Sequence, residues 1–426
     1  MVRIHVGEPI SKNSIWPLIF KHSRWRLSEL AGPGGGLMSN IPEDLNQVDE
    51  RWLTEVLIES HTIPHDNRVV SITKDTHGAG LGYLSEIERI NVKYEFGEGN
   101  YPQQLIAKFP TPSPKSRALA TLFDSYQREV LFYRDYAPAL DIGTPRCYWA
   151  DIEDEPAISR FVNKILGLLP DAVVVRLLDK LLESAGQNQR RSGLLLEDLS
   201  SARVGDQVAG CDLTDARAAL RSIAKFHATF WRQSFEHVDW IHSGSNQSKV
   251  QHGLFMKALP AYKELFVDLI DETVSAQLDW LIEHGVEVLE KCNRNTTLIH
   301  GDFRLDNIFF QDDGSDPILI DFQTVNVYTP MTDIAYFLLP NLDDDVQESQ
   351  MELVAYYWNE LMENGVSDYS WEDCLADYEL AQWWLIHRGV ILIGLVDFSH
   401  PRGGLLIETA VRRGLKGGLA SLPLPW

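Results

Sequence analysis

The order of hydrophobic patterns along the chain constrains its fold most strongly. Five short apolar runs have the pattern of strands, at residues 69–72, 85–94, 105–109, 145–150 and 194–199. The period becomes helical over residues 114–137, and the chain after residue 199 is mostly helical. This order predicts an α+β protein, in which a small sheet-based lobe precedes a larger helical lobe.

The predicted lobes divide the chain into three parts. Residues 1–37 have neither a strand nor a helix period and end in a glycine cluster, so we expect a disordered leader, with an ordered arm as the alternative. Residues 38–199 are predicted to form the N-lobe and residues 200–426 the C-lobe. A helical stripe inside 151–193 predicts an insert in the N-lobe. This stripe could pack against the small lobe, form a dimer contact or line a substrate site.

Charge and composition exclude several classes of partner. The 426 residues carry 38 basic and 61 acidic side chains and a net charge of −23, unlike a nucleic-acid-binding protein or one that binds anionic membranes. The longest apolar stretch, 389–396, is far shorter than the roughly 20 residues of a membrane-spanning helix. The four cysteines lie far apart, which favours reduced thiols. We therefore expect a cytoplasmic protein with no nucleic-acid or membrane partner; the oligomeric state stays open.

The segment 298–323 carries the most specific motif of the sequence. Its spacing is H-G-D-x4-N followed by I-D-F-Q, with Asp302, Asn307 and Asp321 as the polar points between apolar runs. Phosphoryl transfer requires a carboxylate that positions a hydroxyl and accepts its proton, and oxygen ligands that hold Mg²⁺ against the phosphates. The motif therefore favours a phosphotransferase. A β-hairpin with ordinary turn residues is the alternative.

This segment resembles the catalytic loop of the aminoglycoside phosphotransferase and choline kinase superfamily, whose members have a protein kinase-like fold. The resemblance implies a bilobal protein with a small antiparallel-sheet N-lobe and a larger, mostly helical C-lobe. It implies that Asp302 is the catalytic base, that Asn307 and Asp321 bind Mg²⁺, and that His300 is structural. Arg304 would neutralise charge on the transferred phosphate, with a solvent-facing loop arginine as the alternative.

Two features of this region argue against a protein kinase. Gln323 stands where the D-F-G motif of protein kinases has its glycine. Only eleven residues separate Asp321 from Asp333, too few for a loop that docks a peptide. Asp333 resembles the structural aspartate that supports the catalytic loop.

Upstream residues fit an ATP site. Gly78, Gly80 and Gly82 would let the backbone close over phosphates, although glycine-rich hairpins are common. Lys108, near the end of a predicted strand, resembles the lysine that binds the nucleotide; a surface lysine is the alternative. Glu129, 21 residues later on the next helix, could pair with it or be a solvated acid.

Further motifs indicate which branch of the superfamily the chain resembles. The run that contains Glu197 and Leu199 resembles the hinge whose backbone binds adenine. His227 lies on the apolar face of a predicted helix, which favours a packed core histidine over a catalytic one. Together with I-D-F-Q, these motifs look most like the ecdysteroid kinase-like branch, and the resemblance covers about residues 50–400.

The predicted function is an ATP- and Mg²⁺-dependent kinase of a hydroxyl on a small molecule. A catalytically idle nucleotide-binding or scaffold protein is an alternative from another class, although it would be expected to have lost one of the key residues. The acceptor is expected to be a steroid-like or other apolar alcohol, or else a cation of the aminoglycoside or choline type. Acidic candidates for a cation site are Asp343, Asp344, Asp345, Glu348 and Glu352. Aromatic candidates for the cleft are Tyr356, Tyr357, Trp358, Trp371, Trp383 and Trp384.

Overall fold

The computed structural model describes residues 41–75, 84–97, 99–154, 171–187, 190–395 and 401–424. The predicted leader 1–37 and the glycines Gly78, Gly80 and Gly82 lie outside the described residues. The boundary between lobes at residue 199 stays a prediction.

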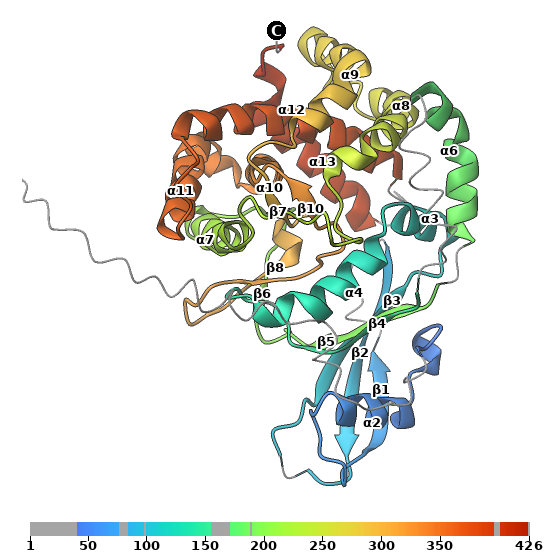
Figure 1. Cartoon of the computed structure of the whole chain (residues 1–426). Helices are drawn as coiled ribbons and strands as arrows, with labels where there is room; N and C mark the ends of the chain where they lie inside the picture. Colours follow the sequence, from blue (N-terminus) through green and yellow to red (C-terminus); the bar gives the residue numbers. More distant parts are fainter. Residues whose placement is uncertain are drawn as a thin grey trace, which may run out of the picture. The chain divides into compact units, whose positions relative to one another are not determined.

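An antiparallel sheet dominates the first part of the described chain. Its strands are β1 (Val69–Asp75), β2 (Ser85–Tyr94), β3 (Gln104–Pro110), β4 (Cys147–Ile152) and β5 (Ser192–Glu197). They pair in the order β1-β2-β3-β5-β4 (Figure 1). The predicted small antiparallel sheet and the α+β fold are therefore confirmed.

The sheet separates two apolar cores, and the alternation of side chains along β5 shows it. Leu195 packs into the core under helix α2 (Glu50–Glu59), whereas Leu194 and Leu196 face the larger core on the opposite side. In β3, Ile106 packs toward the same large core. Lys108 has the same parity as Ile106, so the pleat turns its side chain toward that side of the sheet.

The helical period over residues 114–137 predicted one long helix, and this prediction is wrong. Two helices are present, α3 (Pro114–Leu122) and α4 (Ser125–Asp135). Asp124 between them has a φ of 53°, in the left-handed region, which interrupts helical hydrogen bonding and which a short polar side chain tolerates. The change of direction places the face of α4 that contains Glu129 against the sheet (Figure 1).

Helices form most of the rest of the chain. They are α6 (Asp171–Gly186), α7 (Leu213–Thr229), α8 (Ser248–Leu265), α9 (Glu272–Lys291), α10 (Met331–Asn341), α11 (Gln350–Glu363), α12 (Trp371–Leu395) and α13 (Pro401–Lys416). The predicted helical stripe of the insert belongs to α6, which packs against both α3 and α8. The insert thus contacts a helix between two strands of the sheet and a helix that follows the sheet in the chain.

Short strands hold the segment around the predicted catalytic motif. β7 (Thr297–Ile299) pairs with β10 (Asn326–Tyr328). β8 (Ile308–Phe310) lies between β6 (Arg203–Val204) and β9 (Ile318–Leu319). Because β7 and β8 belong to different sheets, the motif is not a simple hairpin, and the loop between these strands is fixed at both ends.

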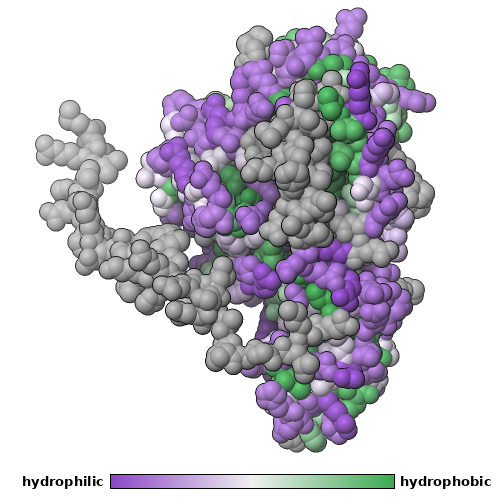
Figure 2. All heavy atoms as spheres, turned by 45° about the vertical axis from the view of Figure 1, so that its right-hand side comes forward, coloured by the Kyte–Doolittle hydropathy of each residue, from purple (hydrophilic) through white to green (hydrophobic). Residues whose placement is uncertain are grey.

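Polar residues dominate the face shown in Figure 2, with small groups of hydrophobic residues between them. No helix among the described residues is long and apolar enough to cross a membrane. All four cysteines are free thiols, as the sequence predicted, and three of them are buried.

Candidate active site

Asp333 at the start of α10 holds the loop that follows β7. Its carboxylate accepts hydrogen bonds from the backbone N–H groups of His300, at 2.7 Å, and Gly301, at 2.8 Å. Gly301 has a φ of 78°, and a Cβ atom there would lie 2.5 Å from the carbonyl oxygen of Thr324, so glycine is required. The fully buried His227 also contacts Asp333, at 3.1 Å. The predictions of a bracing Asp333 and a packed His227 are confirmed.

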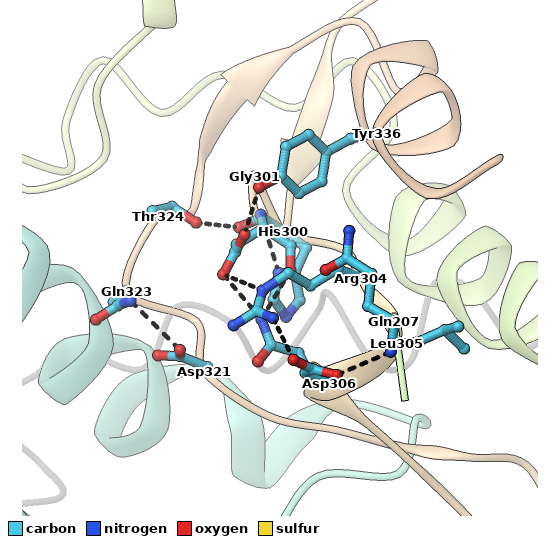
Figure 3. A network of polar contacts seen from close by, with 12 residues as sticks. Gln207, His300, Gly301, Arg304, Leu305, Asp306, Asp321, Gln323, Thr324 and Tyr336 are labelled. Carbon is cyan, nitrogen blue, oxygen red and sulfur yellow. Dashed lines mark hydrogen bonds and ion pairs between the residues drawn. The ribbon is translucent and has the colours of Figure 1, made fainter. Parts of the chain in front are cut away.

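Three donors surround the carboxylate of Asp302. The Tyr336 hydroxyl donates to Oδ1 at 2.9 Å, and the Asn307 amide donates to Oδ2 at 2.9 Å. Arg304 Nε lies 3.3 Å from the same Oδ2. Figure 3 shows Tyr336 and Arg304 reaching this point from α10 and from the loop. An ionised carboxylate has about four acceptor positions, so one remains for a substrate hydroxyl.

The surroundings keep Asp302 ionised. Burial opposes the charge, but the Arg304 guanidinium and the other donors outweigh it and lower the pKa of Asp302 below its ordinary value. Its side chain is 15% exposed and lines a cleft. A carboxylate in this position can accept a proton from a hydroxyl that enters the cleft.

Arg304 is fixed by a second carboxylate that the sequence reading missed. Its NH1 donates to Asp306 at 2.9 Å, and Asp306 also accepts a hydrogen bond from the backbone N–H of Gln207 at 3.0 Å (Figure 3). The Arg304 side chain is 13% exposed and lines the same cleft as Asp302. Arg304 is therefore not a solvent-facing loop arginine.

Lys108 joins three parts of the chain. Its Nζ lies 2.7 Å from Glu129 Oε1 on α4 and 2.7 Å from Asp321 Oδ1, which follows β9. All three side chains are largely buried, with exposed fractions of 8% for Lys108, 4% for Glu129 and 18% for Asp321. The predicted pair of Lys108 and Glu129 is present, whereas the sequence reading did not foresee the second contact of Lys108.

This cluster has one positive and two negative charges. Burial raises the pKa of Glu129 to about 7, because Lys108 only partly offsets it and Asp321 adds to it. The carboxylates of Asp321 and Glu129 outweigh the effect of burial on Lys108 and raise its pKa. Because this buried cluster has one more negative than positive charge, binding of a cation or of a proton would stabilise it.

Asp321 and Asn307 have side-chain oxygens of the kind that the predicted role of magnesium ligands requires. Asp321 has a φ of 68°, an uncommon conformation that accompanies functional sites. Asn307 uses its amide nitrogen for Asp302, which leaves its amide oxygen as the group for a metal. Nowhere in the described chain do three or more His, Cys, Asp or Glu side chains form a metal cluster. Phosphate and water oxygens would have to complete the coordination.

A cleft of about 240 Å³ opens beside this network. Asp302, Arg304 and Asp321 line it on the side of the catalytic motif. Its apolar wall comes mainly from α3, α12 and α13, and consists of Leu84, Leu119, Phe123, Trp384, Ile391, Leu392, Leu406 and Ile407. The cleft thus combines a reactive carboxylate with a largely apolar surface.

The structure agrees only in part with the predicted adenine-binding hinge and with the predicted aromatic lining of the cleft. Glu197 donates its backbone N–H to Arg146 O at 2.9 Å, so only its carbonyl could serve adenine, and neither Glu197 nor Leu199 lines the cleft. Of the aromatic candidates, Trp384 alone lines the cleft, and none of the acidic candidates does. Tyr357 and Trp383 are buried, because the core and not the cleft takes up these rings.

The comparisons with known proteins decide the family. The ecdysteroid kinase-like family matches residues 79–366, more than half of the chain. The chain belongs to the ecdysteroid kinase-like family. This membership points to a small-molecule phosphotransferase and agrees with the branch that the motifs indicated. A search of curated proteins found no match.

Solved structures with a similar arrangement add little beyond the family. A Plasmodium vivax ethanolamine kinase has 13% identity and a TM-score of 0.48, with 93% of this chain and 98% of that chain covered. The GDP and kanamycin complex of APH(2")-IIia has 12% identity and a TM-score of 0.46, with 86% and 97% covered. At these values no substrate can be transferred from those proteins to this family member.

Proposed function

We propose that the protein transfers the γ-phosphate of ATP to a hydroxyl of a small apolar alcohol, with Mg²⁺. The observation that carries the proposal is the double contact of Lys108. This lysine joins β3 and α4 to Asp321, which lines the same cleft as Asp302. Phosphoryl transfer needs this combination, because catalysis depends on positioning and on stabilising charge.

Each residue has a role in the proposed reaction. Asp302 orients the acceptor hydroxyl and accepts its proton, while Asn307 and Tyr336 hold the carboxylate in place. Asn307 and Asp321 would hold Mg²⁺, which supplies charge stabilisation for the phosphates. Lys108, fixed by Glu129, would contact the phosphates, as would Gly78, Gly80 and Gly82; Glu197 and Leu199 would contact adenine through their backbones.

Arg304 would stabilise the phosphate during transfer. It lines the cleft next to Asp302, and its ion pair with Asp306 restricts its movement. A positive charge fixed near the transferred group lowers the barrier without reorganisation at the moment of reaction.

The lining of the cleft favours an apolar acceptor over a cationic one. Its acidic residues are Asp302 and Asp321, both already assigned to catalysis, and no other described acid lines it. An aminoglycoside would need further carboxylates. The rings of Tyr328, Tyr336 and Trp384 line the cleft. The guanidiniums of Arg128 and Arg388 line it too, however, and would repel a choline-type cation. A hydroxylated compound with a large apolar body matches the leucine and isoleucine wall.

The experiment is a measurement of ADP formation from ATP and Mg²⁺ with a panel of acceptors. Neutral hydroxysteroids and long-chain alcohols should raise ADP formation above the rate without acceptor, and choline, ethanolamine and kanamycin should not. Nucleotide binding without turnover of any acceptor would favour the catalytically idle scaffold, and turnover of the cations alone would overturn the apolar acceptor.

A further inference from the structure

The cleft contains two arginines that the proposed phosphoryl transfer does not use. Arg128 belongs to α4 and Arg388 to α12, and both line the cleft that Asp302 lines. Arg128 is only 4% exposed. Burying a guanidinium is unfavourable unless a partner compensates the charge.

No carboxylate of the described residues is in ion-pair contact with either guanidinium, and the opposite charge that acts on Arg388 is that of Asp302, whose pKa Arg388 lowers. No described residue forms an ion pair or a side-chain hydrogen bond with Arg128 or Arg388, and the Nε atom of each is buried and unpaired. The Asp124 carboxylate, four residues before Arg128, contacts His242 at 3.3 Å and forms no ion pair with Arg128. Burial lowers the pKa of Arg128, the charge of Asp124 opposes this, and the positive charge of Arg388 adds to it. The two like charges therefore lie near each other and repel.

Two more unpaired polar atoms line the same cleft. The hydroxyl of Tyr328 and the side-chain oxygen of Asn326 are buried and have no hydrogen-bond partner among the described residues. Buried polar atoms of folded proteins are nearly all paired, so four unpaired ones around one cleft point to a polar ligand. Three of the four, on Arg128, Arg388 and Tyr328, can donate hydrogen bonds, and two of these carry a full positive charge.

We propose that this group receives an oxyanion of the acceptor, and that the acceptor is an amphipathic hydroxy acid. Its hydroxyl would lie at Asp302, its carboxylate at Arg128, Arg388 and Tyr328, and its apolar body against the wall of the cleft. The inference rests on the proposed function and specifies its substrate class. The planar guanidinium matches a carboxylate with two parallel hydrogen bonds.

A second cavity gives room for a longer apolar body. It has a volume of about 90 Å³ and shares Gln207, Tyr336, Leu392 and Ala410 with the lining of the main cleft. Its other lining residues are mostly aliphatic and include no acidic side chain among the described residues. An aliphatic chain could therefore extend from the main cleft between α10, α12 and α13.

The arginines are less suited to the nucleotide. Of the residues assigned to Mg·ATP, Lys108 and Asn307 do not line this cleft and Asp321 does. Arg128 and Arg388 line it together with the apolar wall. On α4, Arg128 is followed directly by Glu129, and consecutive helical side chains point about 100° apart. The nucleotide and the acceptor would thus contact different faces of the same helix.

The test compares acids with their methyl esters. Binding of ω-hydroxydodecanoate and lithocholate, each against its methyl ester, is measured by isothermal titration calorimetry for the full chain with a non-hydrolysable ATP analogue. The wild type should bind each acid about tenfold or more tightly than its ester, as expected for charge-assisted hydrogen bonds. Arg128→Gln and Arg388→Gln should each remove most of this preference for the acid and leave ester binding unchanged. Arg128→Lys and Arg388→Lys, which keep the positive charge, should retain part of the preference.

Controls separate this inference from the proposed function. Arg412→Gln removes an exposed arginine of α13, paired with Glu408, and should leave the preference for the acid intact. Thermal melting and Mg·ATP binding show whether each variant is folded. Equal binding of acid and ester by the wild type would overturn the inference, as would Arg variants that weaken Mg·ATP binding and not acid binding. If neutral alcohols are phosphorylated as well as hydroxy acids, the inference is overturned and the proposed phosphotransferase function stands. If the arginines bind acids but no phosphate is transferred, the anion site stands and the proposed function is overturned.

Discussion

Arg128 and Glu129 are adjacent on α4 but belong to different environments. Glu129 forms a buried ion pair with Lys108 on β3, while Arg128 lines the cleft that contains Asp302. One helix therefore connects the predicted nucleotide site with the predicted acceptor site. A displacement of α4 would change both sites together.

Tyr336→Phe should move the acid limb of the pH–rate profile. The Tyr336 hydroxyl donates to Asp302, and this bond stabilises the ionised form that must accept a proton. Loss of this hydrogen bond to a charged group should raise the pKa of Asp302. The acid limb of kcat/KM should therefore shift to higher pH. An unchanged profile with lower activity would mean that Tyr336 has only a structural role.

Glu129→Gln should change how stability depends on pH. The carboxyl of Glu129 has a pKa of about 7 in the folded chain and 4.5 ordinarily, so the folded state binds more protons between these values. This group therefore stabilises the fold fully below pH 4.5, and the contribution is lost as the pH rises to about 7.

Denaturant unfolding between pH 4.5 and 7 measures this effect. The wild type should lose more stability across the window than Glu129→Gln does. Glu55→Gln, which removes an exposed acid that pairs with Arg51, serves as the control and should follow the wild type. Equal slopes for Glu129→Gln and the wild type would show that Glu129 is ionised throughout.

Asp321→Asn should weaken the binding of Mg·ATP more than that of ATP without metal. Asparagine tolerates the left-handed backbone of Asp321, so the variant removes the charge and keeps the conformation. The loss of a charged ligand should weaken affinity for Mg·ATP by about tenfold to a hundredfold. Isothermal titration with and without Mg²⁺ checks this. An equal loss in both titrations would assign Asp321 to positioning Lys108 and not to the metal.

Local spacing was enough to predict part of the site. Asp302 and Asn307 lie five residues apart in one loop, so their contact follows from a short motif. Lys108 and Glu129 are 21 residues apart, on a strand and on the second helix after it, and the predicted pair is present. A small sheet followed from short apolar runs between turns, and its antiparallel pairing followed from the resemblance to the kinase superfamily.

Long-range geometry was beyond the sequence. Arg128 and Arg388 meet in one cleft from helices separated by more than half of the chain, and neither belongs to a motif with a known spacing. The break at Asp124 carries no glycine or proline, so the helical period seemed continuous. Trp383 and Trp384 are neighbours in a helix whose apolar residues lie on more than one face, and only packing decides which of them lines the cleft.

The most direct test of the proposed chemistry is transfer of labelled γ-phosphate from ATP to an apolar alcohol by the wild type and by Asp302→Asn. The substitution removes the proton acceptor and leaves Lys108, Asn307 and Asp321 in place. The account predicts Mg²⁺-dependent labelling of the alcohol by the wild type and a rate about 10²–10⁴-fold lower for the variant, with Mg·ATP affinity nearly unchanged. Asp313→Asn, in an exposed turn, should match the wild type. A variant Asp302→Asn that keeps more than about half of the wild-type rate would contradict the assignment of Asp302 as the catalytic base.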